Sequence, residues 1–442
     1  MTSQPNTLET YDVVIVGGGI AGLTVAYQLG NQNVLLLEKE DMCGGRTLST
    51  NLGSYVFNQG AQMIPGGETN VAKLADELGV TRTLIDKTKT STYMKGKFVT
   101  GSSDFWFLLG LPVPLFEKLK MAFGIIRMRS RYSGIVDKSP RSDDQKLQEL
   151  SEKTLVERLS IRHPTVKAFW DSVAKSSSTL GAAEVAAFQP VNTFLHHAAD
   201  EFFVEGGTLQ ITRTLAEKTK AKIETGAAVI EVVSTSSGVT IRYEKNGTLH
   251  TVKAKNCVMA VPAPLALGVV QDLPDFKRVV LEQCQYGAMS SAAFLVDRPS
   301  EEFFGDGVWR VPVVGMKTIG IGDPTFTFPE DIKRKDGGGL IRLYAGDDGS
   351  QALQKMSDEE ALDEFEKDLF EIFPSARGRI LDRALKHWPH AICPWRVGRL
   401  DQIDDIRAPH DNIHYCGDYT ENSGLESAVL SAKRVVSELT KS

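Results

Sequence analysis

Three glycines near the start of the chain have the spacing of a diphosphate-binding turn. Gly17, Gly19 and Gly22 form the pattern G-x-G-x-x-G, in which each glycine has its own task. The first allows a tight turn, the second lets a diphosphate approach the backbone, and the third lets a helix pack closely on a sheet. The N–H groups at the start of that helix, with its partial positive charge, favour a bound diphosphate.

A carboxylate follows where such a site requires one. Glu38 comes 21 positions after Gly17, the separation at which an acid accepts hydrogen bonds from a ribose diol. The same negative charge would repel a 2'-phosphate, so NADP is disfavoured. The glycines and Glu38 together predict a bound dinucleotide, because a merely structural glycine turn would leave the position of the acid unexplained.

The elements around these residues have the order that the site needs. The β-branched run 13–16 predicts a strand buried on both faces. Residues 20–29 then have helical spacing, and a second apolar strand over 33–38 ends at the carboxylate. This order predicts a Rossmann-like α/β unit.

Length and composition indicate a globular protein of two or three domains. The chain has 442 residues, of which 42% are hydrophobic and 24% charged, with a net charge of -6. Acidic and basic residues are interspersed, so nothing indicates nucleic acid as a partner. The five cysteines are scattered without a C-x-x-C pair. We therefore expect a reducing compartment, no disulfide framework and no metal.

No feature indicates secretion or a membrane span. The first ten residues lack a basic start and an apolar run, and no apolar stretch reaches the ~18 residues that cross a bilayer. We therefore expect a cytoplasmic protein. The apolar segment 105–126 leaves three interpretations open: a buried helix, a peripheral membrane contact, or the mouth of a substrate tunnel.

Two further motifs carry a resemblance to a known family. Gly44, Gly45 and Arg46 directly follow the second strand, and the stretch "FNQGAQMI" contains Gly60 and Ala61. Here the chain resembles the flavin-dependent amine oxidoreductase superfamily, which includes monoamine oxidases, protoporphyrinogen oxidases and phytoene desaturases. The resemblance implies that the G-G-R motif holds FAD and that the stretch lies beside the flavin ring.

The same resemblance implies the rest of a non-covalent FAD site. Val229 would touch the adenine. Near the C-terminus, Gly417 and Asp418 end a strand, and the Asp418 carboxylate would bind the ribityl chain. Leu425 begins a helix rich in small residues whose first N–H groups would point at the flavin C2 carbonyl, where charge accumulates on reduction.

The implied architecture is interleaved. A Rossmann-like FAD-binding domain would comprise residues 1–90, 203–270 and 386–442. An α+β substrate-binding domain would comprise residues 91–202 and 271–385, where the likeness to the superfamily is loose.

The implied chemistry is hydride transfer from a small substrate to the flavin N5 atom. Amine oxidases of the superfamily carry a lysine near that atom, at a place that Ser291 occupies here. They also flank the ring with aromatic residues, whereas this chain has Gly424 at one such place. Trp388 and Trp395 are candidates for the pocket wall or, equally, for core packing. These four residues are pocket candidates, and no catalytic residue can be named.

Three functions remain open at this point. The leading hypothesis is an FAD-dependent dehydrogenase, desaturase or oxidase that acts on a mainly hydrophobic small molecule and passes electrons to oxygen or a quinone. The first alternative is an amine or amino-acid oxidase that releases hydrogen peroxide. The second is a non-catalytic escort of prenylated proteins, which would lack a working flavin site.

Overall fold

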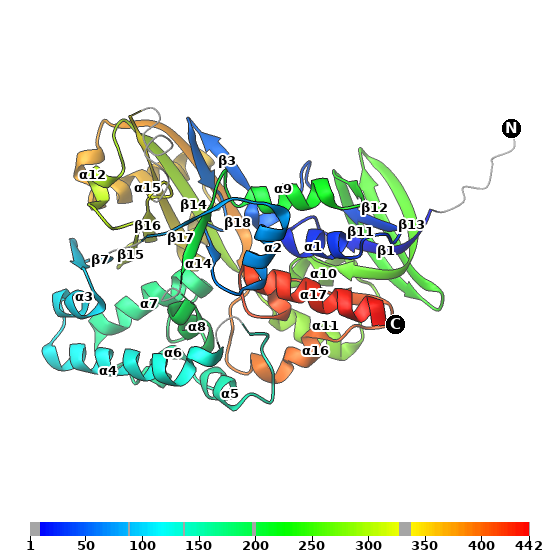
Figure 1. The fold of residues 1–442 in the computed structure, drawn as a ribbon, viewed down its shortest axis with the longest axis horizontal. Helices are drawn as coiled ribbons and strands as arrows, with labels where there is room; N and C mark the ends of the chain where they lie inside the picture. Colours follow the sequence, from blue (N-terminus) through cyan, green and yellow to red (C-terminus); the bar gives the residue numbers. More distant parts are fainter. Residues whose placement is uncertain (1–8, 87–88, 136–137, 197–199, 327–336, 442) are drawn as a thin grey trace, which may run out of the picture.

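The computed structural model describes residues 9–86, 89–135, 138–196, 200–326 and 337–441. Within these ranges the chain forms two seven-stranded sheets, a group of helices and two small sheets. Figure 1 shows the first large sheet and its helices at the end of the molecule where both termini lie, and the second large sheet at the opposite end.

The first large sheet is built around the two strands that the glycine motif predicted. Its strand order is β10-β2-β1-β13-β12-β11, and β19 pairs with β13. Five strands run parallel to one another: β10, β2, β1, β13 and β19. On its other side β13 pairs with β12, and β11, β12 and β13 form an antiparallel meander. The strand bounds are Thr10–Val16 for β1, Val34–Leu37 for β2, Lys222–Glu224 for β10, Ala227–Thr235 for β11, Gly238–Lys245 for β12, Thr248–Met259 for β13 and Ile413–Tyr415 for β19.

Alternate residues of β1 face two different hydrophobic cores, as expected for a strand buried on both sides. Val13 and Ile15 pack against a helical layer, and Val14 and Val16 pack under the meander. The helical layer contains α1 (Ile20–Gln28), α2 (Asn70–Leu78), α9 (Leu209–Lys218) and α17 (Leu425–Lys441). The helices on the meander side are α10 (Ala263–Val269), α11 (Asp275–Gln283) and α16 (Ile403–Arg407).

The second large sheet has the order β18-β14-β17-β16-β15-β7-β8. One of its faces packs on α12 (Glu301–Phe304), α14 (Asp347–Leu353) and α15 (Asp358–Ile372). Its strands are β7 (Thr90–Met94), β8 (Lys97–Gly101), β14 (Gly287–Val296), β15 (Arg310–Val314), β16 (Thr318–Gly322), β17 (Gly339–Gly346) and β18 (Ile380–Ile392).

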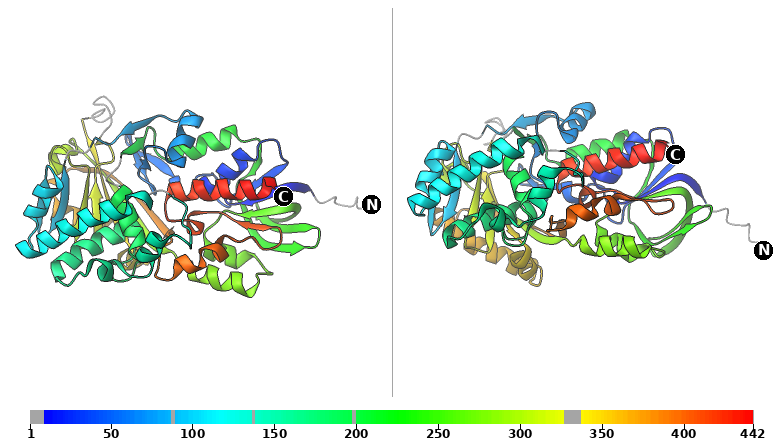
Figure 2. Two further views of the ribbon diagram at one scale, coloured as in Figure 1. Left: turned by 60° about the horizontal axis from the view of Figure 1, so that its bottom comes forward. Right: turned by 90° about the horizontal axis from the view of Figure 1, so that it is seen from below.

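A group of helices lies beside this sheet and has its own core. Trp170, Phe188 and Trp395 are among its buried side chains. Figure 2 shows these helices, in cyan and teal, along one side of the molecule. They are α3 (Asp104–Gly110), α4 (Leu115–Tyr132), α5 (Gln145–Ser151), α6 (Leu155–Leu159), α7 (Pro164–Ser178) and α8 (Phe188–His196). No helix among the described residues is both long and apolar enough to cross a membrane.

Two small sheets connect the large units. β3 (Ser49–Leu52) pairs with β4 (Tyr55–Asn58), and β9 (Glu201–Val204) lies between β5 (Ile64–Pro65) and β6 (Arg82–Leu84). Leu52, Tyr55 and Phe57 pack against Ala293 and Leu340 of the second large sheet. The face of that sheet opposite α15 therefore contacts the segment that leads into residues 57–64.

The division into two interleaved domains remains a prediction. Three strands cross its predicted boundaries: β7 at 90/91, β9 at 202/203 and β18 at 385/386. In addition α11, which the division assigned to the substrate part, packs on the first large sheet.

Candidate functional site

The glycine motif forms a turn from β1 into α1, as the sequence predicted. Gly17 has a φ of 109°, and a Cβ atom there would lie 2.7 Å from the Ala260 carbonyl oxygen. At Gly22 a Cβ atom would lie 2.1 Å from the Gly17 carbonyl oxygen. Both positions therefore require glycine, the first for conformation and close approach, the second for helix packing.

Gly19 differs from these two glycines. It precedes α1 with an ordinary extended backbone, φ -78° and ψ 179°, and a Cβ atom there would have no neighbour within 4 Å. Protein packing therefore does not explain this glycine. The open space lies in front of the first N–H groups of α1, which have no acceptor within the helix. This is the geometry that a bound diphosphate needs.

The G-G-R motif lies directly beside this space. Gly19 and Gly44 form a parallel β-bridge, and the Gly44 N–H donates to the Gly18 carbonyl at 2.9 Å. A Cβ atom at Gly45 would lie 3.4 Å from the Gly19 Cα. The two motifs, one before α1 and one after β2, thus line a common cradle that larger side chains would fill.

Glu38 lies at the end of β2 and is 8% exposed. Its carboxylate accepts the Gly18 N–H at 2.6 Å and the Glu40 N–H at 2.9 Å. These bonds fix the carboxylate against the glycine turn while each oxygen keeps a further lone pair for a ligand. The Glu38 carbonyl also accepts the Ala227 N–H at the start of β11, the strand that carries half-buried Val229.

Arg46 and Asp418 form an ion pair that joins the two ends of the chain. The two Nη atoms of Arg46 each donate to one Asp418 oxygen at 2.8 Å, across 372 positions of sequence. Arg46 also donates to the Ala391 carbonyl at 2.9 Å, and the Tyr286 hydroxyl donates to Asp418 at 2.9 Å. Burial by itself would lower the pKa of Arg46, but Asp418 and Tyr286 raise it above its usual value. Burial, with the Asp418 charge, raises the pKa of Tyr286.

The stretch with Gly60 and Ala61 lies against the G-G-R motif. A Cβ atom at Gly60 would lie 2.1 Å from the Arg46 carbonyl oxygen, and the Ala61 N–H donates to that same oxygen at 2.9 Å. The Thr208 hydroxyl, just before α9, donates to the Ala61 carbonyl at 3.0 Å. Residues 57–64 are therefore held next to Arg46.

The C-terminal helix α17 begins at Leu425, shortly after Asp418 of the Arg46–Asp418 ion pair. Gly424, with a φ of 103°, precedes Leu425, and a Cβ atom at Gly424 would have no neighbour within 4 Å. The Gly417 N–H donates to Ser431 Oγ at 2.9 Å, so the small residues of α17 hold the turn before Asp418 close to the helix. Figures 1 and 2 show α17 beside α1, and the two helices share one hydrophobic core.

Trp388 and Ser291 lie on the wall that the second large sheet presents to this region. The Trp388 indole N–H donates to the Gln59 carbonyl at 2.9 Å, which ties β18 to the 57–64 stretch. Ser291 is 2% exposed and lies opposite Lys386 of β18. The Lys386 ammonium lies 4.9 Å from the Trp388 ring centroid. The sequence analysis missed Lys386, because strand register alone brings it beside Ser291.

Trp395 is placed differently. It is 1% exposed, its ring meets Phe188 edge-on with centroids 4.8 Å apart, and the Arg399 guanidinium lies 5.2 Å from its ring centroid. It belongs to the core of the helical group. This placement favours the core-packing interpretation over a role beside the flavin.

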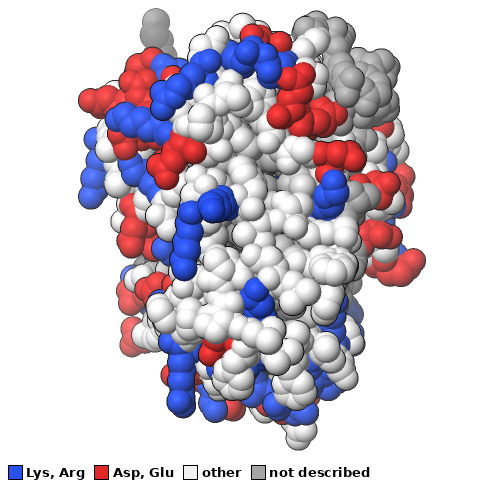
Figure 3. All heavy atoms as spheres, turned by 90° about the vertical axis from the view of Figure 1, so that its left-hand side faces the viewer, with Lys and Arg blue, Asp and Glu red and all other residues white. Residues whose placement is uncertain are grey.

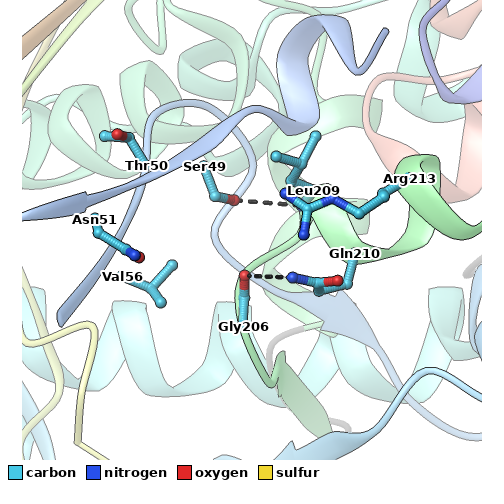
Figure 4. A pocket seen from close by; sticks show the side chains of 8 residues that line it. All are labelled: Ser49, Thr50, Asn51, Val56, Gly206, Leu209, Gln210 and Arg213. Atoms are coloured by element: carbon cyan, nitrogen blue, oxygen red, sulfur yellow. Dashed lines mark hydrogen bonds between the residues drawn. The ribbon is translucent and has the colours of Figure 1, made fainter. Parts of the chain in front are cut away.

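A cavity of about 310 Å³ lies beside the cradle and outside it. Figure 4 shows its lining from β3, β4 and the start of α9: Ser49, Thr50, Asn51, Val56, Gly206, Leu209, Gln210 and Arg213. A Cβ atom at Gly44 would lie 2.9 Å from the Leu209 side chain, so Leu209 separates this cavity from the G-G-R motif. Among the described residues, no group of His, Cys, Asp or Glu could hold a metal ion.

The fold and the cradle define an FAD-dependent oxidoreductase with a Rossmann-like unit and a second, mixed α/β unit. The family model described as "Flavin containing amine oxidoreductase" matches residues 20–440. The chain therefore belongs to the flavin-containing amine oxidoreductase family, and FAD is its cofactor.

Relatives of known description match over nearly the whole chain. A protein described as a probable flavin-containing monoamine oxidase A of Dictyostelium discoideum is 25% identical over 97% of both chains. The chloroplastic protoporphyrinogen oxidase 1 of Spinacia oleracea is 22% identical, over 97% of this chain and 85% of its own. A putrescine oxidase solved with bound putrescine superposes with a TM-score of 0.80 at 20% identity, over 98% of this chain and 99% of its own. The last comparison supports the fold alone.

The predicted family, fold class, enzyme class and cofactor are thus confirmed. The non-catalytic alternative is not retained, because the matched relatives are FAD-dependent oxidoreductases.

Proposed function

We propose that Gly17, Gly19, Gly22 and the G-G-R motif hold the FAD diphosphate, with Glu38 on the ribose. The observation that carries this proposal is that four separate segments converge on one cradle: the glycine turn, the G-G-R motif, residues 57–64 and the C-terminal segment. The Arg46–Asp418 ion pair joins the second of these segments to the fourth. Val229 would line the adenine end. Gly417, Asp418 and Leu425 would lie at the flavin end, with Gly60 and Ala61 along the ring.

When bound, FAD supplies the acceptor for a hydride taken from the substrate. The chain's own residues position and shield that reaction. The N-terminus of α17 favours negative charge beside it by ~0.3–1 kcal/mol or more where water is excluded. Trp388 and Ser291 hold the opposite wall, and Gly424 leaves room at the helix start.

We propose a small, mainly apolar substrate and an electron acceptor that is oxygen or a quinone. A second candidate is amine oxidation, which the names of several relatives support. Among the lysines of the second unit, Lys317 could be considered for the amine-oxidase role if the alignment at Ser291 were shifted. Its ammonium instead pairs with Glu364 of α15, on the face of the second sheet away from the cradle. Lys386, beside Ser291, is the ammonium that an amine oxidase mechanism would have available.

Anaerobic bleaching of the flavin by a panel of amines, porphyrinogens and polyenes distinguishes these candidates. We expect at least one polyene or porphyrinogen to bleach the flavin within seconds to minutes, since reduction needs no external acceptor. Bleaching by amines alone would establish the second candidate instead. Reoxidation of the bleached enzyme by oxygen and by a soluble quinone then identifies the acceptor.

We also propose that α3 and the start of α4 contact a membrane surface containing anionic lipid. Phe105 and Trp106 of α3 are 63% and 59% exposed. On α4 the exposed large side chains follow helical spacing along one face: Leu115, Phe116, Leu119, Phe123 and Ile126. The buried residues of α4, Met121, Met128 and Tyr132, lie on its other face.

The charges on α4 favour anionic lipid as the occupant of this apolar face. The helix contains one acid, Glu117, and five basic residues: Lys118, Lys120, Arg127, Arg129 and Arg131. Figure 3 shows a largely uncharged area over the end of the molecule where α3 and α4 lie, with Lys and Arg at its lower margin. An apolar helix face bordered by cations is typical of peripheral membrane contact.

Vesicle sedimentation tests this contact. We expect the protein to sediment with vesicles of phosphatidylcholine and phosphatidylserine, and the double substitution Leu119→Glu/Phe123→Glu to reduce binding by at least about tenfold, since it buries two charges in place of apolar side chains. The matched control, Leu249→Glu/Leu381→Glu, changes two equally exposed residues elsewhere and should bind like wild type. Equal binding by both variants would contradict the proposal. Light scattering gives a second test. If wild type formed a dimer and Leu119→Glu/Phe123→Glu, but not the control variant, were a monomer, the apolar face would be an interface between two copies of the chain, which would also contradict the proposal.

A further inference from the structure

One face of the second large sheet carries three cations without acidic partners. Arg342 is 9% exposed, and Arg310 and Lys386 lie on the same face. Within the described ranges, none of these three side chains forms an ion pair with an Asp or Glu. A buried guanidinium without a carboxylate is costly, because its desolvation is not offset by an opposite charge.

Strand register brings these cations together. Lys386, Ser291 and Tyr344 lie side by side across β18, β14 and β17. Two residues further along, Arg342 of β17 lies beside Gly322 of β16, which lies beside Arg310 of β15. Residues two apart on a strand share a face, so the two rows point to the same side.

β16 contributes no side chain to this face. Its residues in the two rows are Gly320 and Gly322. A Cβ atom at Gly320 would lie 2.2 Å from the Tyr344 hydroxyl oxygen, so the Tyr344 ring leans over β16. Gly322 separates Arg342 from Arg310, and no β16 side chain comes between the two guanidinium groups.

The guanidinium of Arg342 is held in place by neutral groups only. Its Nε donates to Ser291 Oγ at 2.8 Å, and its Cζ lies 4.9 Å from the Tyr344 ring centroid. The bond to Ser291 directs the head group along the strand toward Lys386 and Trp388. Burial first, and then the neighbouring charge of Arg310, lower the pKa of Arg342 to about 10, so it stays cationic at neutral pH.

The face of the sheet that carries Arg342 also contacts residues 55–59, which lead along the proposed flavin site. Leu340, two residues before Arg342, packs with Tyr55 and Phe57, and Trp388 donates to Gln59. The Nη atoms of Arg342, unlike its Nε, have no acceptor among the described residues. A rigid guanidinium with free Nη donors matches the two oxygens of a carboxylate.

We propose that Arg342, supported by Arg310, binds the carboxylate of an organic-acid substrate whose reacting carbon lies toward Trp388. This inference rests on the proposed flavin site and narrows its substrate to an apolar molecule with an acidic end. Ser291 acts as a positioning residue that holds the guanidinium. Ser291 of β14, at the place where amine oxidases have a lysine, would then orient an arginine.

Three matched ligands test the charge preference of this site: 3-phenylpropionate, 3-phenylpropan-1-ol and 3-phenylpropylamine. Each is titrated into the FAD-loaded protein, and binding is followed by the change in the visible flavin spectrum and by the shift in Tm. We expect the acid to bind about tenfold to a hundredfold more tightly than the alcohol, the range of a charged hydrogen-bonding partner. The amine should bind more weakly than the alcohol.

The substitution Arg342→Gln should remove this preference, and Arg310→Gln should reduce it. Arg342→Lys should keep part of it, because a single ammonium replaces the two-pronged donor. The matched control Arg242→Gln changes an arginine of β12 that pairs with Glu231, and it should behave like wild type. Without ligand, Arg342→Gln should not lower the Tm, since it removes a buried charge that has no partner; a structural arginine would lower it.

The possible failures are distinguishable. Equal affinity for acid and alcohol in wild type would overturn the carboxylate site, and so would an acid preference that survives Arg342→Gln. A Tm shift with the acid but no change in the flavin spectrum would place the acid elsewhere. If the protein holds no FAD at all, the proposed function fails, whereas the Tm series still tests whether Arg342 binds the acid.

Discussion

Gly19→Val should yield a folded protein that does not retain FAD. The backbone at Gly19 is extended and suits any residue, and its Cβ would meet no protein atom within 4 Å. The new side chain would instead fill the space before α1 where the diphosphate approaches. We expect FAD affinity to fall on the order of 100-fold or more, equivalent to about 3 kcal/mol or more, with little change in the stability of the apoprotein.

The visible absorption of the purified and reconstituted protein measures this effect, and circular dichroism measures the fold. Gly124→Val in α4 is the matched control, because its Cβ also meets nothing within 4 Å, and it should stay yellow. Gly22→Val should behave differently from both, since its Cβ would lie 2.1 Å from the Gly17 carbonyl and folding itself should suffer. A Gly19→Val protein with full FAD content would show that the diphosphate lies elsewhere.

Asp418→Ala should destabilise the protein as well as weaken FAD binding. Asp418 is 4% exposed at its side chain, and its removal leaves the Arg46 guanidinium without its charge partner and the Tyr286 hydroxyl without its acceptor. Breaking a buried pair costs about 3–5 kcal/mol. Because the Arg46 side chain keeps 32% exposure, we expect the lower end, about 3 kcal/mol in the free energy of unfolding of the apoprotein.

A double-mutant cycle separates the pair from the rest of the site. Denaturant unfolding of Asp418→Ala, Arg46→Ala and the double variant should give a double loss clearly smaller than the sum of the single losses. Additive losses would show that the two groups do not stabilise one another. In the same variants FAD retention should fall, and an unchanged affinity for FAD in Asp418→Ala would contradict its predicted place at the ribityl chain.

The local parts of the proposed FAD site could be predicted from the sequence because each is a short motif between recognisable elements. The turn at Gly17, the helix after Gly19 and the strand before Glu38 are all formed by neighbouring residues, and their periodicity is visible in the chain. The family resemblance then supplied the order of the distant segments. The structure confirms the fold class that these motifs predicted.

The contacts that depend on strand register could not be predicted in this way. Nothing in the sequence shows that Lys386 lies opposite Ser291, or that Arg310 and Arg342 flank Gly322. The pairing of Arg46 with Asp418 was also missed, because each was considered only as a ligand of FAD. Trp395 illustrates the opposite case: its residue type suited a pocket wall, but Phe188 and the helical core bury it.

An experimental structure of the FAD-loaded protein tests the central claim most directly. The account predicts one continuous FAD density that runs from Glu38, past the backbone of Gly19 and Gly44, to the N-terminus of α17 at Leu425, with Arg46 and Asp418 both within hydrogen-bonding distance of it. A flavin bound away from α17, or a diphosphate that does not approach Gly19, would contradict the account.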